Sequence, residues 1–250
     1  MAISAIISIG LPVALFVLFR KKYNAKCLPM IIGAAAFIVF ALILERSIHL
    51  LVFAKTTIRE KPFLYIVYGI FMAGIFEETA RFISFNILKK KYDGIGTGLS
   101  YGVGHGGIES ILLGGTAMIA DIVYCVIINT GNIKILTGKL QGTGLEQMNG
   151  VINTLVTTVP YLFLVSAFER TLALGIQISL SILVFYSVYG KNKKWLFPLA
   201  ILCHAIIDIP AAAGQAGVLK NVFMIEGIVC ICAAAIILFA INVHKKLKGK

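Results

Sequence analysis

Charge is scarce in this sequence. Charged residues make up 14% of the 250 residues, whereas soluble globular domains carry about 25%. A soluble chain of this length could not bury a sequence that is 59% hydrophobic. The shortage of charge therefore excludes a soluble globular domain and predicts an all-α, polytopic transmembrane helical bundle. We expect a single membrane-embedded domain over 1–250, with its motif-bearing core at about 63–213.

Acidic residues are fewer than half as numerous as basic ones, 11 against 23. The basic residues lie in short clusters between apolar segments, which is typical of cytoplasmic loops beside anionic lipid headgroups. This distribution predicts the lipid bilayer as the partner of these charges and argues against nucleic acid. The clusters are Arg20, Lys21, Lys22 and Lys26; Lys89, Lys90 and Lys91; Lys191, Lys193 and Lys194; and Lys245, Lys246, Lys248 and Lys250.

Several familiar motifs are also missing. The five cysteines include no C-x-x-C pair, so neither a zinc ribbon nor a redox motif is indicated. The zinc-protease motif H-E-x-x-H is absent. No basic residue precedes the apolar segment 1–19, so we expect a retained transmembrane helix there instead of a cleaved signal peptide. We find no internal repeat of the kind that inverted-repeat transporters contain.

Long apolar segments are abundant. A membrane-crossing helix needs about 20 mostly apolar residues. Nine segments meet this need if the long run from 95 to 130 breaks at Gly114-Gly115, or eight if one half of that run is re-entrant. The basic clusters then predict a plasma-membrane protein with its N-terminus outside and its C-terminus inside. The segments are 2–19, 28–53, 63–88, 95–113, 114–130, 151–168, 171–190, 195–213 and 221–243.

Seven ionisable residues interrupt these apolar segments, in three clusters with the spacing of one helical turn. A charge at the bilayer centre costs roughly 2.5–3.5 kcal/mol on insertion scales, so such residues need mutual partners or a water pocket. The pattern predicts an active site or an ion path. The clusters are Glu77, Glu78 and Arg81; His105 and Glu109; and His204 and Asp208.

The first cluster has the residues that hydrolysis requires. Arg81 lies one helical turn beyond both glutamates, so its guanidinium can hold one carboxylate while the other takes a proton from water. The sequence does not separate Glu77 from Glu78, because neighbouring helical residues differ by only about 100° around the axis. A buried ion pair that only fixes helix packing is the structural alternative.

The two histidine clusters each place a carboxylate one turn after an imidazole. His105 and Glu109 could ligate a metal ion, orient water or bond to each other, and the glycines around them allow another helix or a substrate to come close. Asp208 is expected to orient the imidazole of His204. The glycines are Gly102, Gly104, Gly106 and Gly107.

Together, these motifs resemble the YhfC family of membrane peptidases. The matching motifs are E-E-x-x-R at 77–81, H-G-G-x-E at 105–109, E-R at 169–170 and H-x-x-x-D at 204–208. The resemblance extends to a superfamily of intramembrane proteases that includes CAAX-prenyl, bacteriocin-processing and PrsW-type enzymes. It implies an intramembrane endopeptidase that hydrolyses a peptide bond of a membrane protein or membrane peptide. The sequence does not indicate an oligomeric state.

The resemblance also implies a role for each residue. Glu78, in preference to Glu77, would activate water with His105, while Arg81 fixes the glutamate pair. His204 would stabilise the oxyanion with help from Asp208. The implied mechanism is glutamic and needs no cofactor, although zinc remains an alternative. Its ligands would be Glu78, His105, Glu109 and His204.

Two departures from the CAAX-protease branch stand out. That branch has its arginine one residue later than Arg81, and an asparagine is common where this chain has Asp208. Two other functions stay open. Buried carboxylates and histidines also serve proton- or cation-coupled membrane carriers, and a non-catalytic scaffold or immunity protein could retain a degenerate site.

Overall fold

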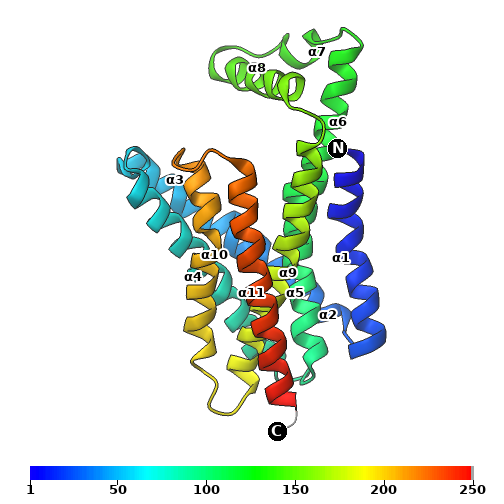
Figure 1. The fold of residues 1–250 in the computed structure, drawn as a ribbon, viewed down its shortest axis with the longest axis vertical. Coiled ribbons are helices and arrows are strands. Elements are labelled where there is room, and N and C mark those ends of the chain that lie inside the picture. Colours follow the sequence, from blue (N-terminus) through cyan, green and yellow to red (C-terminus); the bar gives the residue numbers. More distant parts are fainter. Residues whose placement is uncertain (249–250) are drawn as a thin grey trace. The chain divides into compact units, whose positions relative to one another are not determined.

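The computed structural model describes residues 1–248, and over these residues it is helical with no strand. Seven of its helices are long and apolar enough to cross a membrane, so the chain is a multi-pass membrane protein (Figure 1). Of the predicted basic tail, Lys250 lies outside the described residues. The candidate spans are Ala2–Tyr23, Cys27–Lys55, Pro62–Leu88, Ile95–Asn129, Leu162–Tyr189, Leu196–Gln215 and Val222–Leu247.

Two of the candidate spans consist of consecutive helical segments. The second span joins α2 to α3 through the π-helical segment η1, and the fourth joins α5 to α6 through the π-helical segment η3. The elements are α1 (Ala2–Tyr23), α2 (Cys27–Phe37), η1 (Ile38–Glu45), α3 (Arg46–Lys55), η2 (Ile58–Glu60), α4 (Pro62–Leu88), α5 (Ile95–Glu109), η3 (Ser110–Gly115), α6 (Thr116–Asn129), α7 (Lys134–Thr137), α8 (Gly142–Thr157), α9 (Leu162–Tyr189), α10 (Leu196–Gln215) and α11 (Val222–Lys248).

The predicted break at Gly114-Gly115 is absent, and one helical span runs through both glycines. A Cβ atom on Gly114 would lie 2.7 Å from Ser8 Oγ, and one on Gly115 would lie 2.6 Å from Ile9 Cγ1. The glycines therefore allow α1 to pack closely. A continuous helix also satisfies the backbone hydrogen bonds that hydrocarbon cannot.

The predicted span 151–168 is absent as well. This stretch is divided between α8, which ends at Thr157, and α9, which begins at Leu162 and continues to Tyr189. Glu169 and Arg170 therefore lie within a spanning helix, where they form an ion pair. The predicted count of eight or nine spans is consequently not confirmed.

The chain forms two compact units. The first contains Met1–Leu11 and Ser110–Thr171, and the second contains Pro12–Glu109 and Leu172–Lys250. In the first unit, the Ser4 hydroxyl donates to the carbonyl of Phe163 at 2.5 Å. All seven predicted site residues belong to the second unit. The site can therefore be described within one unit.

Glycine contacts bring the helices of the second unit unusually close around His105. A Cβ atom on Gly104 would lie 1.9 Å from the carbonyl oxygen of Met30 on α2. On another face of α5, a Cβ atom on Gly106 would lie 2.6 Å from the Cβ atom of Gln177 on α9. This packing leaves His105 fully buried, with 0% exposure.

We expect Gly104→Ala to destabilise the protein by about 1–3 kcal/mol or more, because overpacking forces the backbones of α2 and α5 apart. Gly69→Ala is the matched control, since a Cβ atom there meets nothing within 4 Å. It should be neutral or stabilising by up to about 1 kcal/mol through helix propensity. Unfolding in detergent measures both, and an equally stable Gly104→Ala protein would contradict the described contact.

With seven candidate spans we still expect the N-terminus outside and the C-terminus inside, but the expected side of one loop changes. If each candidate span crosses once, the basic loops near 24, 89–94 and 190–195 and the end of α11 are on the same side, which the positive-inside rule predicts to be the cytoplasm. We then expect the segment 130–161 outside, whereas nine spans would have placed 131–150 inside.

The orientation predicts the labelling of single cysteines by a membrane-impermeant maleimide in intact cells. With the five native cysteines replaced, Asn132→Cys should react from outside, whereas Asp93→Cys should react only after the membrane is permeabilised. Both positions are exposed. The reverse pattern would show that the orientation is inverted.

Candidate active site

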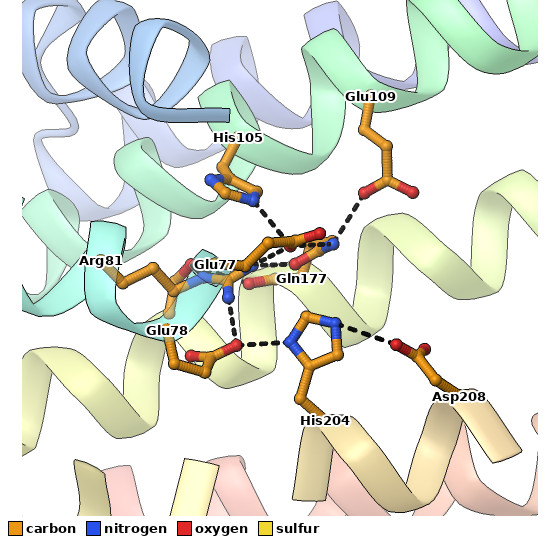
Figure 2. Close-up of polar contacts among 9 residues, drawn as sticks. Glu77, Glu78, Arg81, His105, Glu109, Gln177, His204 and Asp208 are labelled. Atoms are coloured by element: carbon orange, nitrogen blue, oxygen red, sulfur yellow. Dashed lines mark hydrogen bonds and ion pairs between the residues drawn. The ribbon is translucent and has the colours of Figure 1, made fainter. Parts of the chain in front are cut away.

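A buried arginine organises the site. Arg81 on α4 has 0% exposure. Its guanidinium donates to Glu78 Oε1, to Glu77 Oε2 at 3.4 Å and to the side-chain oxygen of Gln177 (Figure 2). Its Nε atom donates to Ser181 Oγ at 3.2 Å. The arginine thus joins both glutamates of α4 to two polar residues of α9.

The two neighbouring glutamates reach different histidines (Figure 2). Glu77 Oε2 lies 2.9 Å from Nε2 of His105 on α5. Glu78 Oε1 lies 2.7 Å from Nδ1 of His204 on α10. The Glu77 side chain is 10% exposed and the Glu78 side chain is 0% exposed. His105 therefore pairs with Glu77, and the structure separates two residues that the sequence could not.

His204 lies between two carboxylates. Its Nδ1 atom faces Glu78, and its Nε2 atom lies 3.4 Å from Asp208 Oδ2, one turn further along α10. The Asp208 side chain is 35% exposed, in contrast to the buried Glu78. The Nδ1 side of the imidazole therefore faces the buried cluster, and its Nε2 side faces the more exposed Asp208.

Gln177 was missed by the sequence reasoning, although it connects three of the predicted residues. Its amide nitrogen donates to Glu77 Oε2 at 3.0 Å and to Glu109 Oε2 at 2.7 Å, while its oxygen accepts from Arg81. Glu109 therefore joins the cluster through α9 (Figure 2). The available signal was a glutamine inside an apolar span, where an amide needs polar partners.

Aromatic rings fix the orientation of His105. The Phe37 ring meets the imidazole edge to face at a centroid distance of 5.2 Å. The Tyr101 ring stacks on it at 5.9 Å. These contacts, together with the glycines of α5, leave the imidazole little freedom to turn away from Glu77.

The fold and the site geometry define a class of protein. This is a multi-pass membrane protein in which carboxylates and imidazoles from three helices, α4, α5 and α10, meet around one guanidinium. Carboxylate–imidazole pairs of this kind are the groups that hydrolases use to move protons.

Comparison with known proteins gives the family. The chain matches the family model described as "YhfC intramembrane metalloprotease" over residues 7–229. It is 36% identical over 239 residues to the "Uncharacterized membrane protein YhfC" of Bacillus subtilis (strain 168), and the match covers 94% of this chain and 91% of that protein. The chain therefore belongs to the YhfC intramembrane metalloprotease family, which indicates an intramembrane protease. No solved structure matches it.

The family description implies a metal ion, and the site can be tested for one. Histidine and carboxylate donors are the types that zinc uses. Their arrangement does not fit, because among the described residues no group of three or more His, Cys, Asp or Glu side chains could hold a metal ion. Of the four predicted ligands, Glu78 pairs with His204, while His105 pairs with Glu77 and Glu109 bonds to Gln177.

We expect Arg81→Met to destabilise the protein by about 3–5 kcal/mol, because it leaves two buried carboxylates without their shared cation. Arg46→Met is the matched control, since Arg46 lies on a spanning helix but is exposed. It should not destabilise the protein, because no buried carboxylate loses a cation and an exposed charge on a span is replaced by an apolar side chain. Detergent-based unfolding measures both. Equal effects would contradict the organising role of Arg81.

Proposed function

We propose that this chain is an intramembrane endopeptidase that uses Glu77 and His105 to activate water. The supporting observation is the contact of 2.9 Å between Glu77 and His105, within a cluster that also contains the separate pair of Glu78 and His204. The order of its motifs supports a relationship to the CAAX-prenyl, bacteriocin-processing and PrsW-type proteases. Its substrate would be a membrane protein or membrane peptide.

Glu77 is a better candidate for the general base than Glu78. Its side chain keeps 10% exposure, whereas the side chain of Glu78 has none and pairs with Arg81. A base must come within hydrogen-bond distance of the attacking water. His105 and Gln177 hold the Oε2 atom of Glu77, so they fix the direction of the carboxylate.

His204 is the candidate for stabilising the oxyanion. Its Nδ1 atom is held by the buried Glu78, and its Nε2 atom points toward the more exposed Asp208. A protonated Nε2 can donate to the carbonyl oxygen as negative charge develops there. In this arrangement Glu78 and Asp208 orient the imidazole and do not react with the substrate.

In this proposal, Glu77 is the only group that accepts and returns a proton during peptide hydrolysis. Water attacks the carbonyl carbon while Glu77 takes one of its protons, and His204 donates a hydrogen bond to the oxyanion. Collapse of the tetrahedral intermediate breaks the carbon–nitrogen bond, and Glu77 returns its proton to the leaving amine. These steps require only side chains of the described cluster.

Replacing Glu77 tests this assignment. We expect Glu77→Gln to lower kcat for a reconstituted transmembrane peptide by about 10²- to 10⁴-fold, the usual contribution of a general base. Glu60→Gln, at an exposed position, controls for loss of a carboxylate and should remain active. Mass spectrometry of the cleavage products measures turnover, and unfolding in detergent shows whether each variant is folded.

Glu78→Gln distinguishes the two glutamates. It should mainly lower stability, because Glu78 is fully buried between Arg81 and His204. If a folded Glu78→Gln protein loses turnover while Glu77→Gln keeps it, then Glu78 is the base and our assignment is wrong. The wild-type protein should also remain active in a strong chelator. Loss of turnover that zinc restores would contradict the metal-free chemistry.

A further inference from the structure

One helix of the first unit has a role that the proposed chemistry does not explain. Helix α8 (Gly142–Thr157) contacts α6 and α7, yet none of its residues is buried. Its apolar side chains recur every three or four residues, which places them on one face of the helix. They are Leu145, Met148, Val151, Ile152 and Leu155.

The opposite face of α8 is polar but almost uncharged. It contains Glu146, Gly150, Asn153 and Thr157, and α8 has no lysine or arginine. Val151 is 37% exposed and Val156 is 66% exposed at the two margins of the apolar face. A helix with one apolar and one polar face can lie at a boundary between hydrocarbon and water.

The short connection from α8 to the next spanning helix places α8 close to the membrane surface. Only residues 158–161 separate α8 from the spanning helix α9, and four residues extend at most about 14 Å. Tyr161, which directly precedes that span, is 55% exposed, as is typical of the aromatic residues that mark a membrane surface. Figure 1 shows α8 running across α6 rather than along it.

We infer that α8 lies in the lipid–water interface, with its apolar face in the outer part of the hydrocarbon and its polar face toward water. The occupant of the apolar face is thus the lipid of the same membrane that α6 and α9 cross. Because α8 carries no basic residue, its binding depends on apolar burial and not on anionic headgroups.

Single tryptophan reporters test this inference in the full chain, reconstituted in phosphatidylcholine vesicles. The sequence has one tryptophan, so Trp195→Phe provides a silent background. Val151→Trp reports on the apolar face, and Asn153→Trp is the matched control on the polar face. Both native positions are exposed, and Val156→Trp gives an independent reading if Val151→Trp does not fold.

For Val151→Trp we expect emission at shorter wavelength and about twofold stronger quenching by acyl-brominated lipid than for Asn153→Trp. Bromines near the headgroup should quench more than bromines near the bilayer centre. Aqueous iodide should quench Asn153→Trp more strongly than Val151→Trp. Adding phosphatidylglycerol to the vesicles should leave the difference in quenching between the two reporters unchanged.

Three results would overturn the inference. Equal iodide quenching of both reporters, without quenching by brominated lipid, would place α8 in water. Protection of Val151→Trp from both quenchers would show that protein covers the apolar face, either a second copy or another part of this chain. Lipid quenching that requires phosphatidylglycerol would mean that headgroup charge binds the helix.

Discussion

The ion pairing of Arg81 with two adjacent glutamates is the constraint on which the site depends. One guanidinium without exposure holds Glu77 and Glu78 on the same helix, yet each carboxylate also reaches a histidine of its own. Two like charges in an apolar span are tolerable only with such a shared cation. In the proposed mechanism, the arginine therefore lets Glu78 stabilise the structure while Glu77 acts as the general base.

Close helix packing supplies the second condition. Helix α5 approaches α2 and α9 at positions where only glycine fits, as the contacts of Gly104 and Gly106 show, and His105 is fully buried between them. The glycines around His105 predicted a close approach, but the sequence could not say by which helices. The partner backbones come from distant parts of the chain, so only the three-dimensional structure identifies them.

Much of the fold was predictable because hydrocarbon imposes simple rules on length and charge. The prediction was wrong at Gly114, where a glycine was interpreted as a helix break. The structure shows that this glycine instead allows close packing against α1. In the site, the one-turn spacing correctly grouped Arg81 with its glutamates and His204 with Asp208. It could not choose between Glu77 and Glu78 or reveal Gln177, because those contacts join different helices.

The central claim is that the neighbouring glutamates have separate partners, and a double-mutant cycle on the free energy of unfolding tests it most directly. Combining Glu77→Gln with His105→Gln should show a coupling energy of about 0.5–3 kcal/mol, as for residues in contact. Combining Glu78→Gln with His105→Gln should show a smaller coupling energy, because these two residues are connected only through Glu77 and Arg81. Strong coupling of His105 to Glu78, with none to Glu77, would contradict the account.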